Sequence, residues 1–146
     1  MEQRINIAEI EPMAYKALLN LESYLATTQI SKTHKELIKI RASQINACAF
    51  CINMHTKDAL KNGETEQRIF LLNAWREVYD LYTEEERAIL ALTEEVTLIA
   101  NGGVSEATYQ KAKALFSDTL LAQIIMAIVT INSWNRLAIT THRQPA

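Results

Sequence analysis

Residues that break helices are scarce throughout this chain, and their scarcity constrains the fold more than any other feature. Only 3 glycines and 2 prolines occur among 146 residues, far below average usage. Apolar residues recur at every third or fourth position, the spacing of one face of an α-helix. No series of alternating strands separated by turn residues is visible. The pattern predicts an all-α fold.

Start and stop signals place the helices roughly. Thr83 with Glu86 forms a capping-box pattern at a helix start, and Gly63 is a candidate for a left-handed cap at a helix end. The predicted helices begin near Pro12 and then cover residues 33–45, 48–63, 65–79, 83–100, 105–116 and 118–141. In the first helix, the residues expected to face inward are Met13, Ala17, Leu18, Leu21 and Leu25.

Length and composition predict a single domain, residues 1–146, with a real core. A formal net charge of −2 gives no basic field for nucleic acid, so no nucleic-acid partner is expected. The N-terminal residues lack the pattern of a signal peptide. The longest apolar run, residues 120–131, has 12 residues, whereas a membrane span needs roughly 20. We therefore expect a cytoplasmic protein without a membrane partner, whose apolar last helix favours a homo-oligomer.

Both cysteines lie in one short segment, NACAFCINMHTKDA, residues 46–59. If Asn46 caps a helix there, Cys48 falls in the first turn, and Cys48, Cys51 and His55 share one face. The N–H groups and dipole of a helix start stabilise a thiolate, which is the reactive form of cysteine. In the cytoplasm a close cysteine pair is more often catalytic or metal-binding than structural.

Three interpretations of this segment remain open from the residues alone. A redox pair is one, although the usual βαβ setting of a thioredoxin-like CxxC is absent. A zinc site is another, with Cys48, Cys51 and His55 as ligands and Glu36 or water as the fourth. The third is a pair of buried cysteines that pack as small apolar residues.

The residues on either side of the cysteine pair favour one of these three interpretations. The segment ELIKIRASQINACAFCINMHTKDA, residues 36–59, resembles the signature of the alkylhydroperoxidase D-like (AhpD-like) branch of the carboxymuconolactone decarboxylase family. That signature is a glutamate, a CxxC pair twelve residues on, and a histidine four residues after the second cysteine. Glu86–Arg87 and INSWNR, residues 131–136, are also similar to the family, and the likeness extends over about residues 33–140.

The resemblance implies a role for each signature residue. Cys51 would be the peroxidatic thiol, Cys48 the resolving thiol, and Glu36 with His55 the proton relay. The family fold is all-helical and usually oligomeric, from dimers to hexamers. Members reduce organic hydroperoxides without a cofactor or a metal ligand set, and a dithiol such as a lipoyl group on a carrier protein reduces them again.

Two residues, Phe50 and Glu36, allow another interpretation. The best-known peroxidases of this kind have a histidine immediately before the second cysteine, where this chain has Phe50, which cannot transfer a proton. A redox sensor or a disulfide reductase is the corresponding alternative function. Glu36 also completes a capping-box pattern with Thr33, which would give it a structural role instead. Decarboxylase members generally lack the CxxC pair, so lactone decarboxylation is not expected.

Polar residues interrupt the apolar last helix. Asn132, Asn135 and Arg136 are expected to find hydrogen-bond partners in the core or across a subunit interface. The large aromatic residues expected in the core or an interface rather than in a pocket are Trp75, Tyr79, Tyr82 and Trp134.

Overall fold

The part of the chain that the computed structural model describes, Glu2 and residues 4–146, contains helices and no strands, which confirms the all-α prediction. Met1 and Gln3, which the predicted domain includes, lie outside the described residues. The helices are α1 (Ile7–Ile10), α2 (Pro12–Ala26), α3 (Lys32–Ile45), α4 (Ala49–Lys61), α5 (Glu66–Phe70), the 3₁₀ helix η1 (Leu72–Glu77), α6 (Glu84–Thr97), α7 (Glu106–Leu115) and α8 (Asp118–Thr140).

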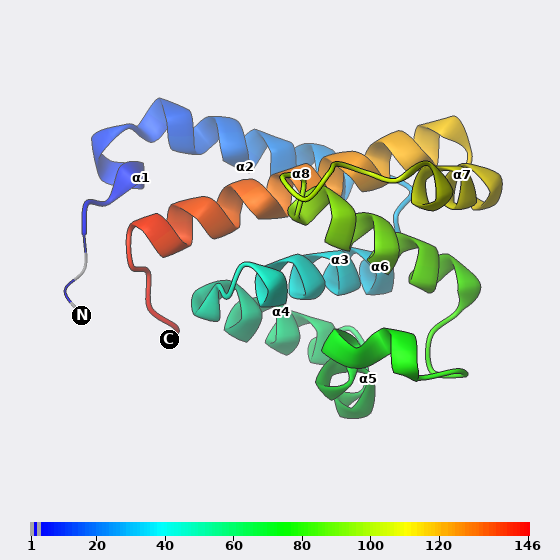
Figure 1. Cartoon of the computed structure of the whole chain (residues 1–146). Helices are drawn as coiled ribbons and strands as arrows, with labels where there is room; N and C mark the ends of the chain where they lie inside the picture. Colours follow the sequence, from blue (N-terminus) through cyan, green and yellow to red (C-terminus); the bar gives the residue numbers. More distant parts are fainter. Residues whose placement is uncertain (1, 3) are drawn as a thin grey trace.

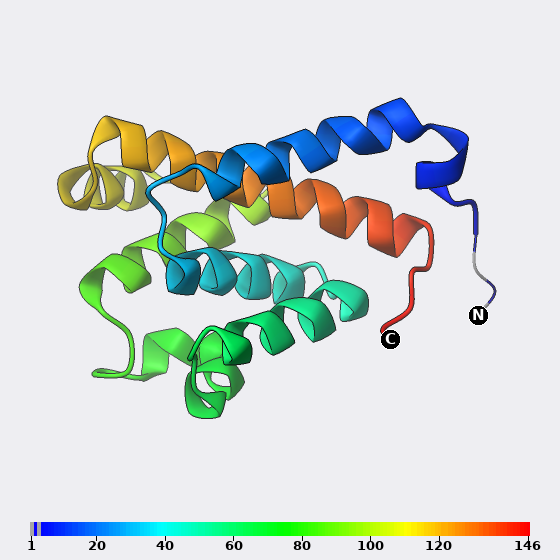
Figure 2. The ribbon, with the colours of Figure 1, turned by 180° about the vertical axis from the view of Figure 1, so that it is seen from behind.

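Helix α3 lies at the centre of the molecule. It contacts α4 on one side, α6 on another and α8 on a third, so polar residues on its buried faces are enclosed by protein. Helices α2, α8, α3 and α4 follow one another across the molecule, as the two opposite views show (Figure 1, Figure 2). The candidate residue Glu36 is on α3, and the cysteine pair and His55 are at α4, so the two helices in closest contact supply the site.

Two apolar clusters fill the space around α3. The larger joins α3 to α6, α7 and α8, with Ile38, Ile89 and Ile128 almost fully buried. The second packs the opposite face of α3, through Leu37 and Ile40, against η1 and α6. Burying each such side chain contributes about 1.5–3 kcal/mol, so α3 is fixed from both sides.

Several predicted boundaries are confirmed. Thr83 and Glu86 form the full capping box, and Gly63 has a φ of 92° just after α4, a left-handed conformation that suits glycine. The predicted helix 65–79 is interrupted, because Ala74 has non-helical backbone angles within η1. The predicted helix 83–100 ends at Thr97 instead.

The expected inward stripe of the first helix was largely wrong. Of its five residues only Leu25 is buried, and Met13 is 84% exposed. Among the described elements, α2 is contacted mainly by α1 and α8, so most of its surface stays exposed.

Helix α8 agrees with the predicted helix 118–141 to within one residue. Over 18 of its 23 residues the mean hydropathy is 1.2, so it is long and apolar enough to cross a membrane by length and composition alone. A core helix passes the same test, and α8 contributes Leu121, Ile124 and Ile128 to the larger cluster.

A charge network joins α5 to α6. The Arg68 guanidinium donates to both carboxylate oxygens of Glu86, at 3.0 and 2.7 Å, and also pairs with Glu64. Burial by itself would raise the pKa of Glu86, but the hydrogen bonds from Arg68 and from the Thr83 N–H hold it below its usual value. Glu86 therefore stays ionised in the folded chain at neutral pH.

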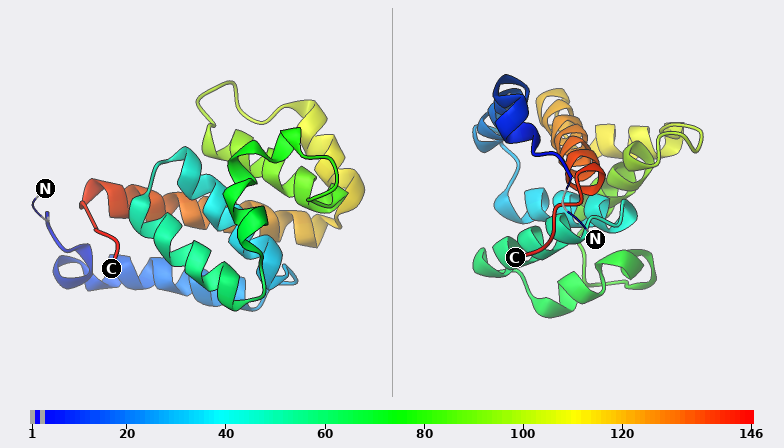
Figure 3. Two further views of the ribbon diagram at one scale, coloured as in Figure 1. Left: turned by 90° about the horizontal axis from the view of Figure 1, so that it is seen from below. Right: turned by 90° about the vertical axis from the view of Figure 1, so that its left-hand side faces the viewer.

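The two ends of the chain lie at the same end of the molecule (Figure 3). The Arg4 N–H donates to the Thr141 carbonyl at 3.3 Å, and the Arg4 guanidinium donates to the Thr140 carbonyl at 2.9 Å. The C-terminal residues then run over α4, where Asn53 and Lys57 donate to the Ala146 carbonyl. Both ends are thus tied beside the start of α4.

Candidate active site

A sharp reversal between α3 and α4 places the cysteine pair. Asn46 caps the C-terminus of α3, and Ala47 takes a left-handed conformation with φ of 56°. The Cys48 N–H can then donate to the Ser43 carbonyl at 3.0 Å, and α4 folds back along α3. A residue with a side chain is uncommon in this conformation, so the packing of the two helices holds it there.

Asn46 was expected to be the N-cap of the helix that carries the cysteines, α4, and that prediction was wrong. Cys48 is itself the N-cap of α4, and its Sγ accepts a hydrogen bond from the Cys51 N–H at 3.4 Å. The shared-face expectation still holds in part, since Cys51 and His55 lie one turn apart on α4 and are both buried. The backbone N–H groups of this first turn favour negative charge on a sulfur beside them.

Cys48 and Cys51 are joined by a disulfide, with Cα atoms 5.3 Å apart. Each residue is only 2% exposed, and they pack with Ala138 of α8 and with Phe50. The structure therefore contains the pair in its oxidised form, shielded from bulk water.

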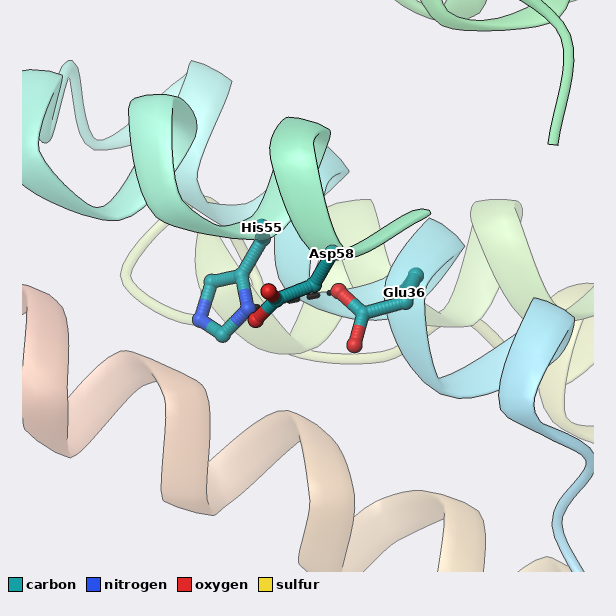
Figure 4. Close-up of side chains that lie close together, drawn as sticks. All are labelled: Glu36, His55 and Asp58. Carbon is teal, nitrogen blue, oxygen red and sulfur yellow. Dashed lines mark ion pairs between the residues drawn. The ribbon is translucent and has the colours of Figure 1, made fainter. Parts of the chain in front are cut away.

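Glu36 of α3 and His55 of α4 point toward each other (Figure 4). The His55 Nδ1 atom is 3.3 Å from a Glu36 carboxylate oxygen, and the side chains are 8% and 11% exposed. Both of these atoms are buried, and neither makes a hydrogen bond. Asp58, one turn further along α4, brings a carboxylate oxygen within 4.8 Å of both. Buried polar atoms without partners are rare and mark places to look for function.

The structural alternative for Glu36 is ruled out by the start of α3. Ser31, not Thr33, is the N-cap, and its hydroxyl accepts a hydrogen bond from the His34 N–H at 3.1 Å. Glu36 therefore does not close a capping box, and its carboxylate is directed at His55 instead.

A cavity of about 490 Å³ opens onto the site. Cys51 and His55 line it, whereas Cys48 does not. Its other walls come from segments far away in sequence: Ile5 to Ala8 around α1, Tyr15 and Leu19 of α2, and Trp134 of α8. The lining is mostly apolar, which suits an organic molecule.

Polar groups stand at one side of this cavity. Lys39 pairs with Glu22 at 3.5 Å, and the Trp134 indole N–H donates to Glu22 at 3.0 Å. Trp134 also meets Tyr15 edge to face, with ring centroids 5.3 Å apart. Trp134 thus lines a pocket, contrary to expectation. Trp75 and Tyr82 are in the core as predicted, while Tyr79 is 90% exposed.

Phe50 sits between the cysteine pair and the C-terminal residues. The Arg143 guanidinium lies over the Phe50 ring, 4.1 Å from its centroid, and both residues line the cavity. The position before Cys51 therefore supplies an apolar wall and an aromatic face for a cation, rather than a proton donor.

Buried amides anchor the end of α3 to α8, as the polar interruption of the last helix predicted. The Asn46 side chain donates to both Asn132 and Asn135 at 2.9 Å. Asn135 donates in turn to Ser43, and Asn132 donates to Thr97. Arg136 donates to the Asn132 side chain at 3.0 Å. This network fixes the reversal on which the cysteine pair depends.

Sequence reasoning thus named residues that the fold brings together: Glu36, Cys48, Cys51 and His55. It missed Asp58, although the spacing of three from His55 on one helix was a usable signal. It also missed the cavity walls from α1 and α2, because tertiary packing alone brings these segments to the cysteine pair.

Comparisons with known proteins agree with the fold and with the family resemblance. The model of the carboxymuconolactone decarboxylase family matches residues 12–95. The uncharacterized protein YdfG of Bacillus subtilis (strain 168) is 44% identical over 146 residues, which cover 100% of this chain and 99% of the relative.

Solved structures share the whole architecture. A protein of unknown function from Agrobacterium tumefaciens, ATU0492, proposed to be an antioxidant defence protein AhpD, matches with a TM-score of 0.94 and 41% identity over 99% of each chain. The debrominase Bmp8, in complex with 2,3,4-tribromopyrrole, matches with a TM-score of 0.83 at 18% identity over 94% of this chain and 73% of its own. The likeness to Bmp8 shows a shared fold and nothing more. The chain belongs to the AhpD-like branch of the carboxymuconolactone decarboxylase family.

Proposed function

We propose that this protein is a thiol peroxidase that reduces organic hydroperoxides through its cysteine pair. The observation that carries the proposal is the placement of Cys51 and His55 on the wall of one apolar cavity, with Glu36 behind His55. An apolar cavity of about 490 Å³ has room for the organic part of a hydroperoxide.

Cys51 is assigned as the attacking thiol because it lines the cavity and Cys48 does not. In the reduced protein the Cys51 thiolate attacks the terminal peroxide oxygen, and the O–O bond breaks. The sulfur becomes a sulfenic acid, and the departing alkoxide takes a proton and leaves as an alcohol.

Cys48 completes the cycle. Its thiolate attacks the Cys51 sulfenic sulfur, water leaves, and the disulfide seen in the structure results. The Cys51 N–H donates a hydrogen bond to the Cys48 Sγ, so the two cysteines lie within one helical turn of each other. An external dithiol then supplies two electrons and two protons to reopen the disulfide.

His55 is the proposed proton carrier, and Glu36 orients it. His55 takes the proton of the attacking thiol and returns one to the alkoxide, while the Glu36 carboxylate stabilises the imidazolium formed in between. A positioned acid or base of this kind contributes typically about 10²–10⁴-fold to the rate.

The reaction also needs a particular compartment and a reducing partner. Reopening a disulfide requires a reducing compartment, so the protein would act in the cytoplasm with a dithiol partner such as a lipoyl carrier protein. The members of the family are enzymes, and the proposed antioxidant role of ATU0492 supports the peroxidase assignment.

Two single-cysteine variants test the assignment. Cys48→Ser should react once with an organic hydroperoxide and retain a sulfenic acid, which a dimedone-type reagent will label on Cys51. Cys51→Ser should neither consume peroxide nor take the label. Reaction of Cys51→Ser, with an inert Cys48→Ser, would show that the thiols have the reverse roles, and wild-type protein that leaves peroxide unconsumed would contradict the function.

Phe50 supports a second candidate, a disulfide reductase or redox sensor. With a phenyl ring beside Cys51, the site has one proton-transferring group fewer than a histidine there would give. That candidate predicts a disulfide that cycles with dithiols while turnover with hydroperoxides stays near the uncatalysed rate.

A further inference from the structure

Glu36, His55 and Asp58 together form a cluster that the proposed peroxide chemistry does not fully use. Each offers one ligand atom, and these atoms all lie within 4.8 Å of one another (Figure 4). Glu36 comes from α3, while His55 and Asp58 come from successive turns of α4. Two helices that pack tightly therefore fix the three atoms.

The cluster carries unsatisfied polar atoms. His55 is 6% exposed and Glu36 is 9% exposed. The His55 Nδ1 atom and a Glu36 carboxylate oxygen are buried and make no hydrogen bond, and they face each other. Leaving a buried polar atom without a hydrogen bond is costly, so a group that bonds to both atoms would stabilise the site.

The charge of the cluster favours a cation. Among the described residues, no lysine or arginine forms an ion pair with Glu36 or Asp58. Two carboxylates therefore share this space with one imidazole. One imidazole nitrogen and two carboxylate oxygens are a ligand set that zinc and similar divalent ions accept.

The distance between the ligand atoms also fits a zinc ion. A tetrahedral zinc ion with bonds of about 2.0–2.1 Å holds its ligand atoms roughly 3.3–3.4 Å apart. The His55 Nδ1 atom and the Glu36 oxygen are 3.3 Å apart. The Asp58 oxygen lies within 4.8 Å of both atoms, and rotation of this partly buried side chain would close the remaining distance.

We propose that Glu36, His55 and Asp58 bind a divalent transition-metal ion of the zinc class, with water completing the coordination. The sequence suggested a zinc site of a different kind, built on both cysteines. The structure closes Cys48 and Cys51 into a disulfide and places two carboxylates beside His55 instead. The proposed site therefore binds metal while the disulfide is closed.

The test uses the full-length oxidised protein, in which a thiol assay finds no free cysteine. Cobalt(II) is the probe, because four-coordinate cobalt gives intense visible absorption. We expect one ion per chain, absorption typical of a site with nitrogen and oxygen ligands, and displacement of the cobalt by one equivalent of zinc.

Two matched variants locate the site. Asp58→Asn keeps the shape of the side chain but removes its charge. It should weaken cobalt binding by at least about 10-fold, because losing even a group that only orients a ligand costs about 10–100-fold. Asp80→Asn removes an exposed carboxylate elsewhere and should leave binding unchanged. Absence of stoichiometric binding, or equal binding by wild type and Asp58→Asn, would overturn the proposal.

One consequence rests on the proposed function. An ion on His55 Nδ1 and Glu36 occupies the proton relay, so zinc should inhibit peroxide consumption by wild-type protein more than by Asp58→Asn, each compared with its own zinc-free rate. The cobalt titration involves neither thiols nor peroxide. It therefore decides the metal site even if the peroxidase assignment fails.

Discussion

At the scale of single residues, Glu36 is the most informative side chain. A carboxylate that is 9% exposed and has no arginine or lysine in an ion pair with it is costly to bury. The local sequence allowed a capping role, but Ser31 caps the helix and Glu36 turns to His55. The choice between the two roles depends on which residue starts the helix, a boundary that sequence patterns place within two to four residues.

Glu36→Gln should therefore lower the rate of peroxide reduction by about 100-fold, because the neutral amide cannot stabilise a charged His55. The measurement is kcat/KM for an organic hydroperoxide across a pH series. Glu9→Gln, at an exposed position of α1, is the control. An unchanged rate and profile would remove Glu36 from the relay.

Phe50→His introduces a proton-transferring side chain immediately before Cys51. We expect kcat/KM to rise by about 10-fold or more, since a second proton-transferring group then stands beside Cys51. Phe50→Leu, which keeps an apolar wall, should not increase the rate. If the two variants are equally active, the absence of a histidine at this position does not limit the proposed peroxide reduction.

At the scale of elements, the caps decide where the helices meet. The Thr83–Glu86 box was readable because both partners are local. The start of α4 was not, because Asn46 is an equally good residue to end α3, and its side chain is used by Asn132 and Asn135 of α8. A sequence shows that such amides need partners, whereas packing selects them.

Asn135→Ala tests that anchor between α3 and α8. The residue is fully buried, and its loss leaves the Asn46 amide and the Ser43 hydroxyl each short of a partner. We expect the free energy of unfolding, from urea titration followed by circular dichroism, to fall by about 2–4 kcal/mol. Ser133→Ala on the same helix should change it by less than about 0.5 kcal/mol. Equal losses would show that the buried amide is not special.

The Arg68–Glu86 pair between α5 and α6 predicts a pH dependence. The folded-state pKa of Glu86 is lowered, so its contribution to stability is complete above the unfolded value near 4.5 and is lost as the pH falls through the lower folded value. Glu86→Gln should cost about 3 kcal/mol at pH 7, because it leaves the Arg68 charge without its main partner.

Unfolding curves for wild type and Glu86→Gln, collected from pH 7 downward, make the comparison. The difference between the two proteins should shrink steadily below about pH 4.5. A difference that stays constant with pH would mean that the carboxylate charge plays no part.

At the scale of the whole molecule, the sequence indicated the fold class and the signature residues, but not the surface. The apolar run in α8 suggested an interface, yet its residues Ile124, Ile128 and Ile131 are buried in the core. Exposed apolar side chains remain in several parts of the described chain. Ile5, Ile10 and Met13 are 60%, 59% and 84% exposed, and Val129 and Ile139 of α8 are 41% and 42% exposed. Helical periodicity cannot show which apolar face remains uncovered.

The predicted homo-oligomer can be measured directly. Light scattering coupled to size exclusion should give a mass that is a multiple of 16.6 kDa. Met13→Glu should shift the population toward the single chain if this surface is buried between copies, since a charge there would be desolvated. A wild-type mass of one chain at micromolar concentration would contradict the prediction.

The central claim is that the cysteine pair performs peroxide chemistry in a single turnover. The measurement is the intact mass of fully reduced, metal-free protein before and after one equivalent of an organic hydroperoxide, with the alcohol quantified alongside. The account predicts the loss of two hydrogens per chain, complete consumption of the peroxide and one equivalent of alcohol. An unchanged mass with the peroxide still present would contradict it.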